Sequence, residues 1–494
     1  LLFGENLEEI IFNKETVQEI YNANYNFSKP PLKPTLTAVS GDKKVFLYWN
    51  KIAEESRDAF MGFENNDPTQ GAKKDFEGYM IYRSTEAEFN DIKVITDSKG
   101  SPVYWKPLVR YDLNDSIKGP DPVGVNGAHF WRGDDTGLRY SYIDTDVQNG
   151  QTYYYACISY DMGDPNRGTK GLQPTECTKI IQQDFAGNIQ FVDYNCAVVI
   201  PNSPVAGYVP PQIKGDTKQV VSGVGTGSMN VNILNPNAIL DGAQYNVIFK
   251  STDDYPLYKT LSYNVVRTFN NVIDTIVVNE DTTNIGSGRI SQPFDGMALT
   301  VLNDTSIIIV DSLTGWVVGS SNLAMTVTPD PTLVRGIPWP ADYEIRFSDT
   351  PEDTCFINSP PLYRKFPVNL KVWNNTEGKY SKVAVKDNDG SQSLTLGDLI
   401  QILEFQGTIT PANARFAWNI SYDPPFDPNE VPVEPVAGDK FQISTLKTFK
   451  TGDMFSYSTL PVQVDKSMAR DNLSRIDVVP NPYLGAATWE KRNL

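Results

Sequence analysis

Apolar and polar residues alternate with a period of two along most of the chain between residues 35 and 465. Clear examples lie at 45–49, 79–83, 153–157, 229–233 and 343–347. Turn-forming sequences such as Gln148-Asn149-Gly150 separate these runs. Such alternation is typical of strands that bury one face. The pattern therefore predicts an all-β protein made of tandem β-sandwich domains.

Three segments depart from this alternation. Residues 5–22 place apolar side chains at helical spacing, with glutamates on the other face, and this predicts a short N-terminal amphipathic helix. A second short helix is expected at 397–405. Residues 422–437 are rich in proline and are expected to form a loop outside any sheet.

The expected domain organisation follows from these patterns and from the length of 494 residues, which suits about three domains. The pattern leaves open whether the two later β-regions are separate domains or one composite. The predicted ranges are a helix and Pro-rich lead-in at 1–34, a first domain with long loops at 35–182, a connector at 183–213, sandwiches at 214–335 and 340–465, and the start of a C-terminal domain at 466–494.

The charge balance excludes several kinds of partner. Lys and Arg number 43 against 60 Asp and Glu, which gives a net charge of −17. Nucleic-acid and anionic-lipid partners usually require a basic face, so neither is expected. No run approaches the 18 or so apolar residues of a membrane-spanning helix, and no transmembrane segment is expected.

Catalytic motifs are largely missing from the sequence. The chain has one histidine, His129, and no nucleophile elbow, zinc-protease motif or phosphate-binding loop. A non-catalytic protein without an organic cofactor is therefore expected. A glycoside hydrolase stays open as an alternative, because its two carboxylates need no short motif.

Calcium is the cofactor for which the sequence offers ligands. Asp134, Asp135, Asp144 and Asp146 are close in sequence, and hard cations prefer several oxygen ligands. An ordinary turn before a strand explains the last two aspartates equally well. Lys386–Ser391 is similar to the start of an EF-hand loop, but Val385 and Leu396 occupy ligand positions, so no EF hand is expected.

Four cysteines are present, and they leave two interpretations open. Cys157 and Cys177 lie on neighbouring strand-like runs, so a cross-strand disulfide is possible. Buried free thiols are the alternative for this pair, as for Cys196 and Cys355.

The first β-region resembles a fibronectin type III domain. The resemblance rests on Pro34-x-Leu36-x-Ala38 followed by Val45-x-Leu47-x-Trp49, on Phe76–Ser84, and on the approach to a sixth strand at Tyr142–Tyr153. It implies that Trp49 is the core tryptophan and that the Tyr153 hydroxyl ties back to upstream backbone. The region departs from the family in length, since an ordinary module has about 100 residues.

The end of the chain carries a second resemblance. Arg475–Tyr483 reads Arg-Ile-Asp-Val-Val-Pro-Asn-Pro-Tyr, which resembles the opening strand of type IX secretion sorting domains. These domains form the C-terminal part of large secreted proteins of Bacteroidetes–Ignavibacteria–Chlorobi bacteria. The resemblance implies a bacterial cell-surface protein whose sorting domain continues beyond Leu494. It also implies O-glycosylation within Asp-(Ser/Thr) triplets, at Ser116, Thr275, Thr282 and Ser312.

Together these observations favour an extracellular structural or adhesive protein. Such a protein would act through self-association or through attachment to neighbouring surface proteins. A carbohydrate-binding accessory region of a secreted glycoside hydrolase is the alternative, with polysaccharide as the partner.

Overall fold

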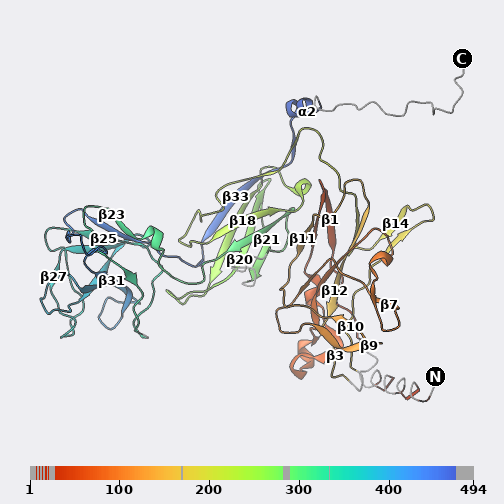
Figure 1. The fold of residues 1–494 in the computed structure, drawn as a ribbon, viewed down its shortest axis with the longest axis horizontal. Coiled ribbons are helices and arrows are strands. Elements are labelled where there is room, and N and C mark those ends of the chain that lie inside the picture. The colour runs from red at the N-terminus through yellow and green to blue at the C-terminus, as the bar shows by residue number, and fades with distance from the viewer. Residues whose placement is uncertain are drawn as a thin grey trace.

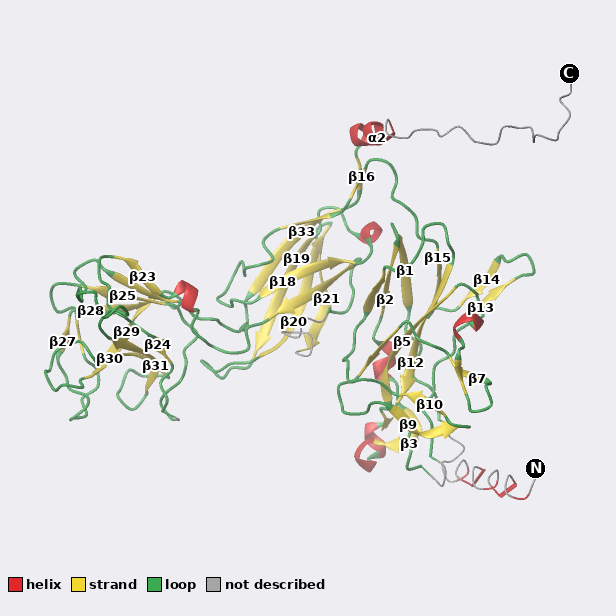
Figure 2. Cartoon of the chain, in the orientation of Figure 1, coloured by secondary structure: helices red, strands yellow, loops and turns green. Residues whose placement is uncertain are grey.

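The computed structural model describes residues 28–167, 171–281, 290–332 and 334–473, together with isolated positions between 7 and 21. The chain is nearly all β, with 43% of it in strands, which confirms the predicted all-β class (Figures 1 and 2). The predicted helix at 5–22 falls largely outside the described residues, and so does the sorting-type strand at 475–483.

The N-terminal unit, residues 28–200, contains two sheets that face each other. One sheet has the order β1–β2–β11, formed by Leu36–Gly41, Lys44–Trp49 and Ser141–Asp144. The other has the order β15–β12–β5–β8, formed by Cys196–Val199, Tyr153–Asp161, Phe76–Ser84 and Val109–Asp112. The first sheet contributes Leu47 and Trp49 to the core between them, and the second contributes Tyr79 and Tyr155.

The outer face of the four-stranded sheet is also buried, because long loops cover it. Met80, Tyr82, Phe130 and Tyr160 belong to a second apolar cluster there. Strands β5 and β12 are therefore buried on both faces, which explains their nearly continuous apolar sequence. Three small hairpins contribute to this cover: β6–β7 at Ile95–Thr96 and Pro102–Tyr104, β9–β10 at Pro120–Val125 and Ala128–Trp131, and β13–β14 at Ile181–Gln183 and Ile189–Val192. A further hairpin, β3–β4, is formed by Asp58–Phe63 and Ala72–Lys73.

The middle unit is assembled from two distant parts of the chain, residues 208–302 and 445–464. Its five-stranded sheet has the order β17–β33–β19–β20–β21, formed by Gln212–Lys214, Met454–Leu460, Gln244–Ser251, Thr260–Phe269 and Val272–Asp281. A two-stranded sheet of β18 (Ser228–Ile233) and β22 (Met297–Leu302) shares its apolar core. The short strands β16 (Tyr208–Val209) and β34 (Gln463–Val464) pair with each other, and α2 follows at Lys466–Leu473.

The inserted unit, residues 303–444, is one curled eight-stranded sheet. Its order is β23–β32–β25–β28–β29–β30–β31–β24, formed by Gly315–Val318, Lys440–Ile443, Tyr343–Phe347, Leu370–Asn374, Lys379–Lys386, Asp398–Phe405, Ala414–Tyr422 and Val327–Thr328. The sheet wraps around a core that includes Tyr343, Val372 and Trp418. A small hairpin, β26 (Asp353–Thr354) with β27 (Pro367–Val368), lies beside it.

The strands group differently from the predicted ranges. Strand β15 extends the N-terminal unit to Val199, inside the expected connector at 183–213. Strands β23 and β24 come from the predicted sandwich at 214–335 but join the curled sheet, whereas β33 comes from 340–465 but joins the middle unit. The predicted Pro-rich loop at 422–437 overlaps β31 at Tyr422, and its remaining residues lead toward β32.

The prediction of a helix at 397–405 is wrong, because Asp398–Phe405 form β30. The run Leu399-Ile400-Gln401-Ile402-Leu403 lacks polar alternation since β30 lies between two neighbouring strands and is buried nearly throughout. A short apolar run of this kind cannot be told from a buried helix by periodicity alone.

Tyr153 makes the backbone contact that the fibronectin resemblance implies. Its hydroxyl accepts a hydrogen bond of 3.0 Å from the backbone N–H of Gln148, five residues upstream. Its ring is buried in the core of the N-terminal unit. This bond fixes the turn before β12 to the strand itself.

We expect Tyr153→Phe to lower the free energy of unfolding by about 1–3 kcal/mol, because it leaves the Gln148 N–H without its acceptor. Tyr104→Phe is the matched control, since the Tyr104 hydroxyl is buried without a partner. Loss of the Tyr104 hydroxyl should leave the free energy of unfolding unchanged or raise it. Urea unfolding followed by tryptophan fluorescence measures both variants, and equal effects would contradict this role of Tyr153.

Candidate functional site

Asp144 and Asp146, two of the predicted calcium ligands, both form ion pairs with Arg83. Both oxygens of the buried Asp144 carboxylate accept hydrogen bonds of 3.1 Å from Arg83, and the Tyr155 hydroxyl donates to it at 2.7 Å. Asp146 forms an ion pair of 3.0 Å with the same guanidinium. Burial lowers the pKa of Arg83, but the hydrogen bonds to Asp146 and Asp144 outweigh burial, so this pKa lies above its ordinary value.

The other two predicted ligands belong to a different loop. Asp135 pairs with Lys118 at 2.7 Å, and Asp134 accepts a hydrogen bond of 3.2 Å from the indole of Trp131. No three of the four predicted carboxylates offer oxygens within 4.8 Å of one another. Their contacts favour a structural role for all four over a shared calcium ion.

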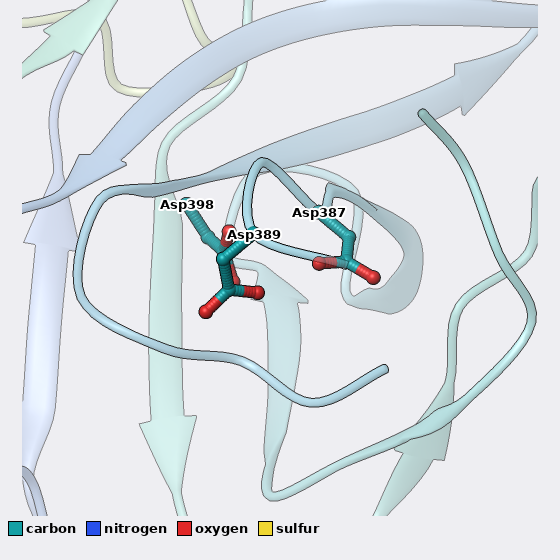
Figure 3. A group of neighbouring side chains, drawn as sticks. All are labelled: Asp387, Asp389 and Asp398. Atoms are coloured by element: carbon teal, nitrogen blue, oxygen red, sulfur yellow. The ribbon is translucent and has the colours of Figure 1, made fainter. Parts of the chain in front are cut away.

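The described residues contain one group of three carboxylates whose oxygens do lie within 4.8 Å of one another, namely Asp387, Asp389 and Asp398 (Figure 3). Asp387 and Asp389 follow the end of β29, and Asp398 begins β30. The EF-hand comparison draws attention to the first two. The EF-hand comparison gives no reason to expect Asp398. This residue lies near the other two carboxylates because β29 and β30 are neighbours in the sheet.

Protein donors already surround these three carboxylates. Asp387 accepts from the backbone N–H of Gly390 at 2.7 Å, and Asp398 accepts from the backbone N–H groups of Asn388 and Thr395, both at 2.9 Å. Hydrogen bonds from Ser391 and Thr395 lower the pKa of Asp389 to about 2. The carboxylates thus stabilise the loop between β29 and β30 by accepting its N–H and O–H groups.

The predicted disulfide between Cys157 and Cys177 is not formed, and all four cysteines are free, buried thiols. Cys157 lies in the core between the two sheets of the N-terminal unit, whereas Cys177 lies in the cluster on the outer face of the four-stranded sheet. The sheet itself therefore separates the two side chains. The second interpretation of the cysteines, as buried thiols, is the one the structure shows.

The predicted glycosylation sites fall at exposed positions wherever the structure describes them. Ser116 lies in a loop, Ser312 lies in a short 3₁₀ turn, and Thr275 lies on β21. Thr282 is outside the described residues. Attachment of a glycan at these residues remains a prediction.

His129, the single histidine, has a structural contact. Its Nδ1 lies 2.7 Å from the carbonyl oxygen of Asp121, across the β9–β10 hairpin.

Within the described residues, no helix combines the length and the apolar character that a bilayer span requires.

Two surface elements each expose several apolar side chains. Residues 271–275, at the start of edge strand β21, are all exposed, and Ile273 is 72% exposed. The β13–β14 hairpin projects from the N-terminal unit, with Phe185 at its tip and with Ile189 and Phe191 exposed along β14 (Figure 1). Several exposed apolar side chains on one strand or hairpin favour a contact site.

No family model, curated protein or solved structure matches this chain. The two resemblances noted in the sequence therefore rest on the quoted residues alone.

We expect Asp144→Asn to destabilise the N-terminal unit by about 3 kcal/mol or more, because it leaves the half-buried Arg83 without its main partner. Asp146→Asn is the control, since its side chain is 91% exposed and a surface ion pair contributes less than about 1 kcal/mol. Urea unfolding with and without added calcium measures both. Calcium-dependent stability that Asp144→Asn removes would show that these residues bind the ion after all.

Proposed function

We propose that this protein is a non-catalytic structural or adhesive protein of the cell surface, which assembles through contacts between its own copies. The observation that carries this proposal is the pair of exposed apolar elements, the β13–β14 hairpin and the start of β21. In the proposed assembly the hairpin of one copy adds to the β21 edge of the next.

Strand β21 suits a partner strand because one of its sides is unpaired within the described sheets. It has ten residues, and within the described sheets its single partner is β20. The pairing with β20 is regular from Val272 to Thr275, so the backbone is extended at the exposed end. Unpaired N–H and C=O groups along such an edge are a template for another strand.

The edges of the curled sheet are protected by comparison. Its edge strands β23 and β24 are short, and residues 319–326 join one to the other. The Pro-rich loop adds to this cover, because Asn322 exchanges hydrogen bonds with the backbone of Val431 and Val433. Short and covered edges are a usual defence against unwanted pairing. Strand β21 is longer, and no other described strand besides β20 pairs with it.

The two elements differ, so the proposed contact is heterologous. A heterologous contact that does not close into a ring produces an open filament. Thr275 lies within the same exposed segment, so a glycan at this residue and a partner strand would compete for the edge.

The finer fold class, tandem sandwiches with a fibronectin type III-like first domain, is part of this proposal. Three observations in the N-terminal unit support it: the division into sheets of three and four strands, the burial of Trp49 between them, and the Tyr153 hydrogen bond. An extracellular location and type IX secretion are proposed from the resemblance at 475–483.

Variants in the two elements test the assembly. Ile273→Lys with Val278→Lys changes β21, and Phe185→Ser with Phe191→Ser changes the hairpin. We expect the unaltered chain to form filaments in negative-stain electron microscopy and each double variant to form none. Each variant lacks one of the two elements that the contact between copies requires.

Mixing the two double variants gives a sharper result. Each retains the element that the other lacks, so the mixture should form dimers and no filaments. Val431→Lys, at an exposed position of the Pro-rich loop, is the control and should leave filaments intact. Filaments in either double variant would contradict the proposed contact, and binding of polysaccharide by an unassembled chain would favour the carbohydrate-binding alternative.

A further inference from the structure

The ammonium group of Lys179, two residues before β13, is surrounded by three aromatic rings. Its Nζ lies 3.5 Å from the ring centroid of Trp105, 4.7 Å from that of Tyr82 and 5.9 Å from that of Phe89. A lysine ammonium is attracted to the face of an aromatic ring when it lies within about 6 Å of the centroid. The three rings therefore form an aromatic cage for this cation.

The aromatic cage is assembled from three parts of the N-terminal unit. Tyr82 lies on β5, Phe89 lies in the loop that follows β5, and Trp105 directly follows β7. The backbone N–H of Lys106 donates to the Ile92 carbonyl at 2.9 Å, which holds the segment after β7 against the loop after β5. The cage thus belongs to the cover on the outer face of the four-stranded sheet, and Lys179 reaches it from the base of the β13–β14 hairpin.

The backbone of Phe89 is strained at this position. Its φ of 59° lies in the left-handed region, which is unfavourable for a bulky side chain. The side chain is 1% exposed and belongs to the same apolar cluster as Tyr82. Because such a conformation persists only where surrounding contacts favour it, the packing of the Phe89 ring fixes this wall of the cage.

The surroundings of Lys179 strengthen its contact with the rings. Burial lowers the pKa of Lys179, and the nearby Glu176 opposes this fall only in part. The Tyr82 hydroxyl donates to Glu176 at 3.1 Å, so the carboxylate is held beside the cage. The ammonium is therefore partly withdrawn from water, where its attraction to aromatic rings is stronger than at an exposed site.

Contacts at its base set the direction of the β13–β14 hairpin, because residues 184–191 are all exposed. Ile181 is buried in the cluster on the outer face of the four-stranded sheet, and the Gln183 side-chain amide donates to the Tyr154 hydroxyl at 2.7 Å. The backbone N–H of Asp193 donates to the Ile180 carbonyl at 3.0 Å, which joins the two legs of the hairpin next to Lys179. The caged lysine is thus positioned to hold both legs.

We propose that Lys179 is a positioning residue, whose insertion into the aromatic cage fixes the direction of the β13–β14 hairpin and so presents it to the β21 edge of the next copy. The presentation to β21 rests on the proposed function, whereas the fixed direction concerns the single chain. A hairpin that is already held in its docking direction loses less conformational entropy when it binds.

Electron spin resonance between two spin labels tests the fixed direction on the dispersed full chain. Labels at Thr145→Cys and Ala186→Cys report the distance from the body of the N-terminal unit to the hairpin tip, since the four native thiols are buried. We expect Lys179→Gln to widen the distance distribution about twofold or more, because the amide carries no charge for the rings. Lys179→Arg should keep it narrow, since a guanidinium also binds aromatic faces.

Lys93→Gln is the matched control. The Lys93 ammonium lies 4.7 Å from the same Trp105 ring but belongs to the loop before β6, so its loss should leave the distribution narrow. If Lys179→Gln fails to fold, Trp105→Leu removes the nearest ring, keeps the lysine and should widen the distribution in the same way. A distribution that stays narrow in these cage variants would overturn the positioning role.

Filament formation is the second readout. We expect Lys179→Gln to need about tenfold more protein to form filaments, because its hairpin is no longer held for docking. A widened distribution with filaments at the unchanged concentration would overturn the role of Lys179 in assembly. If the unaltered chain forms no filaments, the proposed function fails, and the spin-label distances still decide whether Lys179 fixes the hairpin.

Discussion

The return of β33 to the middle unit is the constraint on which the rest of the structure depends. Residues 303–453 separate this strand from β22, yet β33 lies between β17 and β19 and pairs with both. Strand β17 has no other partner among the described strands. The ring of Tyr457 stacks on Tyr245 with centroids 5.1 Å apart, so the core also depends on this late strand. The middle unit therefore needs a strand that follows the whole of residues 303–453 in the sequence.

Polar side chains hold the two crossings of the insertion together. The backbone N–H of Phe449 donates to Asn303 at 3.0 Å, where the chain leaves and re-enters the middle unit. The fully buried Asp453 accepts from the N–H groups of Val224 and Gly225, at 3.1 and 2.9 Å. Because both ends of the insertion are fixed next to each other, the curled sheet is added without disturbing the sheet that carries it. The same arrangement leaves β21 at one edge of the five-stranded sheet.

The sequence predicts local elements well and long-range pairing poorly. Alternation locates β2 and β25, because each buries every second side chain. It cannot show that β33 joins β19, since pairing between strands so far apart leaves no periodic signal in either. For the same reason the boundary predicted between 335 and 340 divides the curled sheet. The prediction for β30 fails because burial on both faces removes the alternation.

The candidate sites show the same limit. Acidic runs draw attention to Asp134, Asp135, Asp144 and Asp146, yet the fold gives Asp144 an arginine partner from β5. The alternation of side chains does help with one cysteine. Cys157 lies on the same face of β12 as Tyr153 and Tyr155, which places its thiol in the core between the two sheets.

Hydrogen–deuterium exchange on assembled and dispersed protein tests the central claim most directly. If copies join by strand addition, the amides of residues 272–275 should exchange at least tenfold more slowly in the assembly, while those of β17 should not change. Assembled protein in which residues 272–275 exchange as fast as in the dispersed chain would contradict strand addition at β21.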